Sequence, residues 1–171
     1  MTDESLWQFD LAWELAELHL SALVDDDFLW QPAPISWTVR PDSSGAWKPD
    51  WSDTEPDPLP VPTIGWLTWH ISWWWSETID HLSGRIPRER TDVTWAGTGA
   101  EAVSRLRALR GQWRELLAGL SSADLEQPSP FPRGSDSGYT VAHTVLWVNI
   151  ELTKNVAEIG QLRLLRAATQ G

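Results

Sequence analysis

Three side chains on two predicted helices could bind a metal ion. His70 lies in a helix predicted over residues 63–83, and Glu151 and Asn155 lie in one predicted over residues 140–168. Two ligands four residues apart on a helix can reach the same ion, and three protein ligands with an open position are typical of a catalytic zinc site. An amide oxygen is a weak, neutral ligand, so the three side chains could instead form a buried hydrogen-bond network.

Other polar and aromatic side chains share these helix faces and could line a pocket. Glu77 and His81 lie seven and eleven residues after His70. At 100° per residue, each lies within about 20° of His70 around the helix axis, so all three share one stripe. The chain has 14 tryptophans, which could form a tryptophan-rich core or the wall of a ligand site. The candidate lining residues are Trp66, Trp74, Glu77, His81, Trp147 and Glu158.

Composition excludes several kinds of chemistry. The 171 residues suit a single domain over 1–171, and the absence of cysteine excludes disulfides, thiolate metal sites and a cysteine nucleophile. No glycine-flanked serine elbow, Walker motif or dinucleotide-binding glycine pattern occurs, so no nucleophile or phosphate loop is assigned.

The net charge and the hydropathy pattern disfavour nucleic acids and membranes as binding partners. A net charge of −11 repels phosphate backbones, so we expect no nucleic-acid partner. The N-terminus resembles no signal peptide and no apolar run is long enough to span a bilayer, so we expect a cytoplasmic protein with no membrane partner.

Hydrophobic periodicity predicts four helices. They are expected over residues 5–24, 63–83, 98–120 and 140–168. No segment shows the alternation of a convincing strand, so the fold class is all-α, a four-helix bundle. The acidic run 25–27 is predicted to mark the exit from the first helix, where the helix dipole disfavours negative charge.

A proline-rich segment separates the first two predicted helices. Residues 30–62 contain most of the prolines, which excludes a regular helix there. The segment also contains Trp30, Trp37, Trp47 and Trp51, so we expect a long loop that its aromatic rings hold against the bundle. Such a loop could be a fixed wall or a moving lid over a site.

Two segments resemble the DinB-like superfamily. They are TIGWLTWHI (63–71), which opens the second predicted helix, and NIELTKNVAEIGQLR (149–163) in the last one. The resemblance covers nearly the whole chain in length and helix order. It implies a four-helix bundle of up-down-down-up topology that is often dimeric, so we expect a homodimer.

The resemblance also implies a metal site. Better understood members bind a divalent ion through one histidine on the second helix and an H-x-x-x-H pair on a later helix. His70 matches the first ligand, whereas Glu151 and Asn155 stand where the paired histidines would be. The expected metal ligands are therefore His70, Glu151 and Asn155, with zinc or nickel as the ion.

Two functions follow as hypotheses. Some DinB-like proteins are transferases that use bacillithiol or mycothiol, so this chain resembles a metal-dependent thiol S-transferase or isomerase with a degenerate metal site. Its arginine and tryptophan content suggests a GC-rich actinobacterial source, which favours mycothiol. The alternative is a non-catalytic small-molecule-binding or dimeric structural protein without metal.

Overall fold

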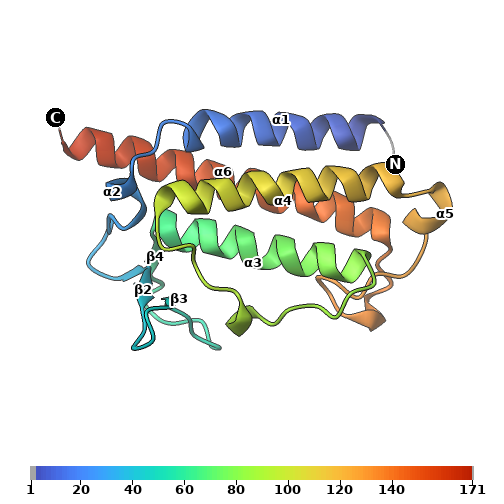
Figure 1. Cartoon of the computed structure of the whole chain (residues 1–171), viewed down its shortest axis with the longest axis horizontal. Helices are drawn as coiled ribbons and strands as arrows, with labels where there is room; N and C mark the ends of the chain where they lie inside the picture. The colour runs from blue at the N-terminus through green and yellow to red at the C-terminus, as the bar shows by residue number, and fades with distance from the viewer. Residues whose placement is uncertain (1–2, 171) are drawn as a thin grey trace.

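The computed structural model describes residues 3–170 and is mostly helical, as predicted. Four long helices lie alongside one another, and α1 and α6 run in one direction while α3 and α4 run in the other (Figure 1). Helix α1 packs against α6, and α3 packs against both α4 and α6. The bounds are Asp3–Leu20 for α1, Ile64–Leu82 for α3, Gly99–Gly119 for α4 and Val141–Thr169 for α6.

Threonines stand at the starts of three long helices, close to the predicted positions. The hydroxyl of Thr63 accepts a hydrogen bond from the backbone N–H of Trp66 at the start of α3, and Thr98 caps α4 in the same way through Glu101. Before α6, the backbone N–H of Thr140 donates to His143 Nδ1 over 3.2 Å. His143 is therefore an exposed residue at the start of α6.

Tryptophans fill the bundle core. Trp69 and Trp75 of α3 and Trp113 of α4 are fully buried, and Phe9 of α1 packs edge-on against Trp75. Helix α3 is buried around most of its circumference. Such a helix can present side chains to two neighbouring helices at once.

The predicted end of the first helix is wrong. Helix α1 ends at Leu20, and residues 25–27 open a further short helix, α2 (Asp25–Phe28). Acidic residues are favoured in the first turn of a helix by its dipole, and Asp27 accepts a hydrogen bond from the backbone N–H of Val24. Asp25 also accepts from the backbone N–H of Gly99, which joins α2 to the start of α4.

The proline-rich loop contains strands that the sequence did not predict. Strand β1 (Ser36–Trp37) pairs in parallel with β4 (Val61–Pro62), and β2 (Val39–Pro41) pairs antiparallel with β3 (Trp47–Pro49). Two or three residues are too few to show an alternating pattern, which is why sequence periodicity misses them. The loop is held against α3 by rings, as expected: Trp37 stacks on Trp66 at 5.2 Å between ring centroids.

Three shorter elements lie in the remaining connections. They are η1 (Arg90–Asp92), α5 (Ser122–Leu125) and η2 (Ser135–Ser137). Across residues 3–170, none of the helices combines the length and the hydropathy needed to cross a bilayer.

Candidate functional site

Helix α3 presents one incompletely buried stripe to its surroundings. His70, Trp73, Glu77 and His81 are half-buried, whereas most other α3 residues are buried. The neighbouring helix α6 runs antiparallel to α3 (Figure 1). It contributes a second stripe of half-buried side chains. Its members are Trp147, Glu151 and Glu158. We call the surface that these two stripes form the α3–α6 face.

His70 lies between aromatic rings and keeps one ring nitrogen free. Its imidazole stacks on Trp66, with centroids 4.9 Å apart and an interplanar angle of 13°, and meets Trp73 edge-on at 5.7 Å. His70 Nδ1 is buried and has no hydrogen-bond partner among the described residues. Burial, with a smaller contribution from the positive charge of Lys154, lowers the pKa of His70 to about 4. The ring is therefore neutral at pH 7.

Asn155 is the centre of a buried polar network. Its Oδ1 accepts a hydrogen bond from Trp74 Nε1 at 3.1 Å, and its Nδ2 donates to Glu158 Oε2 at 3.0 Å. Trp147 packs edge-on against Trp74, with ring centroids 5.4 Å apart. The structure thus brings four of the predicted residues together: Trp74, Trp147, Asn155 and Glu158.

Glu151 lies apart from that network. Its carboxylate forms an ion pair with Lys154 Nζ at 3.0 Å, one helical turn away on α6. Its side chain is 20% exposed and that of Lys154 is 50% exposed, so the pair faces solvent. Lys154 was not predicted from the sequence, although its i,i+3 spacing from Glu151 is a signal for such a pair.

The predicted ligands, as the structure arranges them, do not fit a divalent metal ion. Both polar atoms of the Asn155 side chain are already hydrogen-bonded, and Lys154 balances the charge of Glu151. The same ammonium group raises the electrostatic cost of a cation beside His70. Within residues 3–170, no three or more His, Cys, Asp or Glu side chains are grouped so that they could hold a metal ion.

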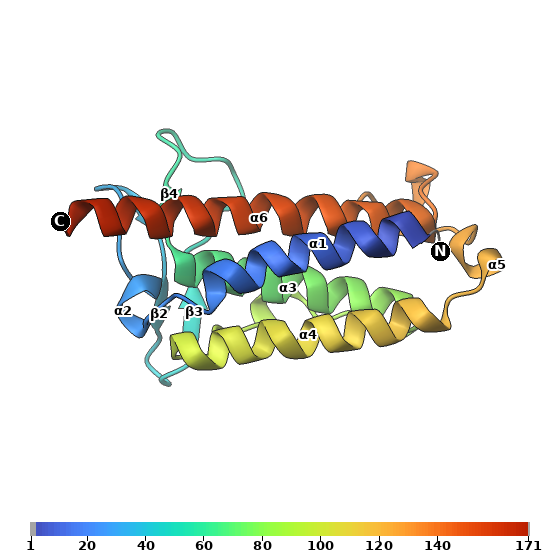
Figure 2. The ribbon, with the colours of Figure 1, turned by 90° about the horizontal axis from the view of Figure 1, so that it is seen from above.

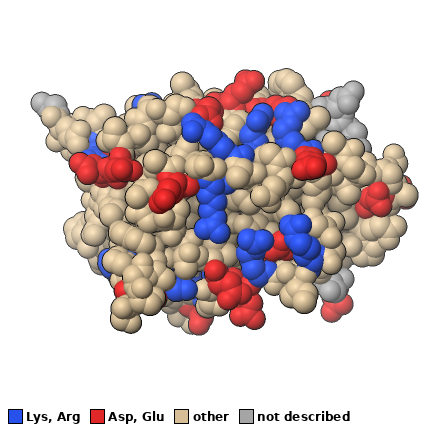
Figure 3. Space-filling view, in the orientation of Figure 1, with Lys and Arg blue, Asp and Glu red and all other residues tan. Residues whose placement is uncertain are grey.

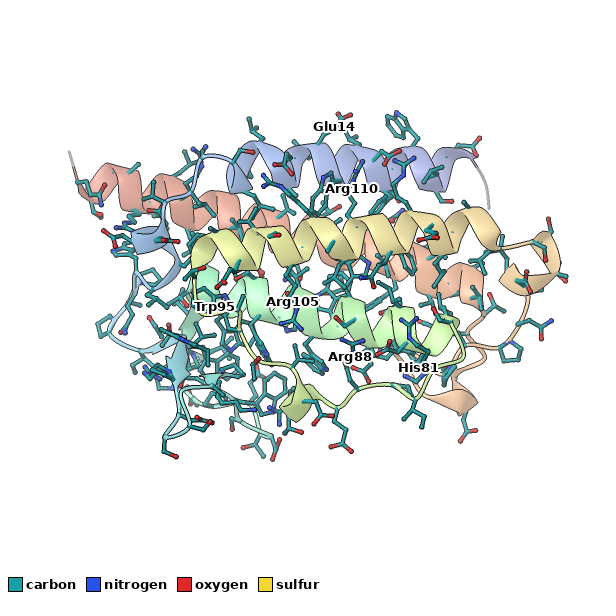
Figure 4. The ribbon with its side chains drawn as sticks, in the orientation of Figure 1. Glu14, His81, Arg88, Trp95, Arg105 and Arg110 are labelled. Atoms are coloured by element: carbon teal, nitrogen blue, oxygen red, sulfur yellow. The ribbon has the colours of Figure 1, made fainter. Side chains whose placement is uncertain are left out.

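The predicted pair Glu77 and His81 lies at the far end of α3. His81 Nε2 is 4.0 Å from Glu77 Oε1, and the ring of His81, which Figure 4 labels, stacks on Phe131 at 5.4 Å. Phe131 in turn meets Trp147 edge-on at 5.2 Å, which links this end of α3 to α6. Burial raises the pKa of Glu77 and lowers the pKa of His81. Phe131 has no sequence signal, because it lies in an irregular connection.

The loop over residues 30–62 borders the other end of the face. Trp51 meets Trp73 edge-on at 5.4 Å, and the guanidinium of Arg90 lies 4.2 Å from the centroid of the Trp51 ring. Trp51 is 37% exposed, so this aromatic group is in contact with solvent. Trp73 could have been predicted from its three-residue spacing to His70, but the approach of Trp51 depends on the fold of the loop.

An apolar cavity in the core and three surface hollows lie elsewhere in the described structure. The cavity lies between the four long helices, and its lining includes Ile71 of α3 and Leu152 of α6. The hollows lie beside α2 and the two ends of α4. None of these four is lined by the predicted pocket residues Trp66, Trp74, Glu77, His81, Trp147 and Glu158.

A known family covers most of the chain. A family model described as DinB superfamily matches residues 8–159, and the chain therefore belongs to the DinB superfamily. Comparison with curated proteins and with solved structures finds no significant match.

Proposed function

We propose that this DinB superfamily member binds a small molecule at the α3–α6 face without using a metal ion. The observation that carries the proposal is the difference between two side chains. Other side chains of the protein already hydrogen-bond both polar atoms of the Asn155 side chain, whereas the buried His70 Nδ1, beside tryptophan rings, has no partner in the part of the chain that the structure describes. Buried polar atoms are normally paired, so a free one next to partly exposed rings is suited to a ligand.

The surroundings of His70 define the class of ligand. The free nitrogen of the neutral His70 ring can donate or accept one hydrogen bond, depending on its tautomer. Trp73 packs against this ring and Trp51 packs against Trp73, so both indoles offer aromatic surface to a ligand. Glu77, Glu151 and Glu158 outnumber Lys154 along the same face, which disfavours an anionic ligand. The ligand we infer is an uncharged or cationic compound with an aromatic or apolar body.

A metal-dependent thiol S-transferase or isomerase is the second candidate. Two observations favour it: the superfamily membership, and the free nitrogen of His70 at the first expected ligand position. It requires zinc or nickel at His70, Glu151 and Asn155, together with mycothiol or bacillithiol as the thiol. Asn155 would have to give up the hydrogen bond from Trp74 to bind the ion.

Elemental analysis separates the two candidates. Tag-free protein and the His70→Ala variant are dialysed against zinc, nickel or manganese, and then against buffer. We expect less than 0.1 equivalent of metal, on the order of background, in both proteins, because the donor set is incomplete. About one equivalent in the wild type that is lost in His70→Ala would overturn the metal-free proposal and justify thiol-transfer assays.

A thermal-shift screen tests ligand binding itself. Aromatic and apolar amines and amides are screened against the wild type, His70→Ala and the control His143→Gln, whose side chain is exposed at the start of α6. A ligand at the α3–α6 face should raise Tm in the wild type and the control but not in His70→Ala. A compound that stabilises all three proteins equally binds elsewhere and would contradict the assignment of the site.

A further inference from the structure

Three arginines gather at the connection between α3 and α4. Arg85 and Arg88 belong to this connection, and both form ion pairs with Asp80 of α3, at 2.8 and 2.6 Å. Arg105 comes from α4, and its Nη1 donates to the backbone oxygen of Thr94 in the same connection at 2.9 Å. We call Arg85, Arg88 and Arg105 the arginine cluster.

The arginine cluster is accessible from solvent on the α4 side of α3. Figure 2 shows α4 and α6 on opposite sides of α3, so Arg105 of α4 lies away from the α3–α6 face. Figure 4 labels Arg88 and Arg105 near each other, between α4 and the connection, and Figure 3 shows a band of Lys and Arg side chains on this face of the molecule. The side chains of Arg85 and Arg88 are 52% and 39% exposed, so a solute can reach them.

Positive charge exceeds negative charge within the cluster. Arg85 and Arg88 share a single carboxylate, that of Asp80. Arg105 forms no ion pair with any carboxylate of residues 3–170. Burial lowers the pKa of Arg105, and the nearby charge of Arg88 lowers it as well. Three guanidinium groups therefore have one carboxylate between them.

The neighbouring acidic side chains do not supply the missing charge. Glu101 lies one turn before Arg105 on α4, but its Oε2 accepts a hydrogen bond from the hydroxyl group that caps this helix, at 2.9 Å. Asp92 lies in η1, and its Oδ2 accepts from a backbone N–H of its own turn at 3.2 Å. Glu89 is exposed and forms no ion pair with a described residue. An anion from solution could therefore balance the cluster.

The free guanidinium nitrogens favour an anion with more than two oxygens. Asp80 accepts from Nε and Nη2 of Arg88, and Thr94 accepts from Nη1 of Arg105. The other nitrogens of these two arginines form no hydrogen bond with residues 3–170. A carboxylate has only two oxygens, which one guanidinium can occupy by itself, whereas a tetrahedral phosphate group has enough oxygens for two guanidinium groups.

We propose that Arg88 and Arg105 bind a phosphate group, either as the free ion or as part of a small phosphate monoester. The bond to Thr94 already holds Arg105 in place, so binding does not have to order this side chain. The net charge of −11 does not prevent binding, because physiological salt screens exposed charges beyond about 8 Å. The site is separate from the α3–α6 face, and neither depends on the other for its ligand.

An NMR titration tests the proposal. Inorganic phosphate replaces chloride at constant ionic strength, and the Nε–H signals of the arginines are followed in ¹⁵N-labelled protein. The signals of Arg88 and Arg105 should shift together, with a Kd of about 1 mM or lower. Arg105→Gln should raise this Kd by about 10-fold or more, because it removes charge-assisted hydrogen bonds. The control Arg107→Gln removes the same charge from α4, but Arg107 already pairs with Glu17, so the Kd should stay within about two-fold of the wild type.

A second variant and two further probes complete the test. Arg105→Lys keeps the positive charge without the planar fork, so it should raise the Kd by about three-fold or more even if Arg105→Gln does not fold. Signals of Arg88 and Arg105 that do not shift, equal weakening in Arg105→Gln and Arg107→Gln, or acetate that binds as tightly as phosphate would overturn the inference. Phenyl phosphate that binds more tightly than inorganic phosphate indicates a monoester as the ligand, and weaker binding indicates the free ion.

Discussion

Two groups of tryptophans, one at the start of α3 and one where α3 meets the 30–62 loop, serve different purposes. Near the start of the helix, Trp66 Nε1 donates to the backbone oxygen of Asp50, and Trp69 Nε1 donates to that of Val93. These bonds fasten the 30–62 loop and the connection between α3 and α4 to the bundle. On the α3–α6 face, Trp73 and Trp51 are only partly buried, and the buried atom His70 Nδ1 has no hydrogen-bond partner among residues 3–170.

The difference shows how to separate structural from functional aromatic residues. A buried indole whose N–H is hydrogen-bonded to a distant segment acts as an anchor for that segment. Rings that remain half-buried around an unpaired polar atom gain little stability from that arrangement and are suited to contact a ligand. Substitutions should therefore affect folding at the first group and ligand binding at the second.

The largest effect should come from removing an anchor. Trp69 is fully buried, so Trp69→Ala should lower the free energy of unfolding by about 4 kcal/mol, measured by urea denaturation. Trp69→Phe keeps most of the ring but leaves the Val93 carbonyl without its donor. It should cost about 1–2 kcal/mol more than Trp75→Phe, because Trp75 is equally buried but its N–H has no partner among the described residues. Equal losses in the two phenylalanine variants would contradict the anchoring role.

A second anchor is ionic and should give the next largest effect. Asp80 is 2% exposed and accepts hydrogen bonds from Arg85 and Arg88, which hold the connection after α3. Asp80→Asn should cost about 2–3 kcal/mol, because two guanidinium groups lose their counter-charge. The control Asp53→Asn changes a side chain that is 93% exposed and should cost less than about 0.5 kcal/mol.

The pH dependence of this anchor has a defined sign. Burial alone would raise the pKa of Asp80, but the hydrogen bonds from Arg88 and Arg85 outweigh burial and hold the pKa below its usual value. A carboxyl group with a lowered pKa in the folded state adds stability above its unfolded pKa of about 4. That stability is lost as the pH falls further, so the cost of Asp80→Asn should shrink below about pH 4. A cost that persists unchanged at pH 3 would exclude the ion pairs as its cause.

The helices were predictable from sequence because their signals are local. Thr63, Thr98 and Thr140 stand before long apolar periodicities, and α3, α4 and α6 begin directly after them. The site was only partly predictable. Spacing correctly placed Glu151 and Asn155 on neighbouring positions of α6, but their partners depend on how far each side chain is turned toward α3. Asn155 is turned inward to Trp74, whereas Glu151 lies at the edge and pairs with Lys154.

Burial of His70 on the α3–α6 face should make the free energy of unfolding depend on pH. Burial holds the pKa of His70 at about 4, so between pH 6.5 and 4 the unfolded chain binds a proton that the folded chain does not. Stability must therefore fall as the pH falls through this window. His70→Gln should remove about 2 kcal/mol of the loss between pH 7 and 5, measured by urea denaturation. His81→Gln should remove less, because His81 is less buried, and the reverse order would contradict the environment described for His70.

The smallest effect is expected at Glu151, and this makes it the most selective test of the site. Its ion pair with Lys154 is partly exposed and lies within one helix, so Glu151→Gln should change the free energy of unfolding by less than about 0.5 kcal/mol. Ligand-induced Tm shifts that depend on His70 should largely survive this substitution, because the Trp74–Asn155–Glu158 network remains intact without Glu151.

If Glu151 were instead the anionic ligand of a metal ion, Glu151→Gln would abolish any metal-dependent rise in Tm while leaving the apoprotein unchanged. The test measures Tm with and without zinc or nickel, in Glu151→Gln and in the wild type. Because this substitution hardly affects folding, a loss of the metal-dependent rise in Tm would identify Glu151 as a metal ligand, and no metal-dependent rise in either protein would identify it as part of an ion pair only.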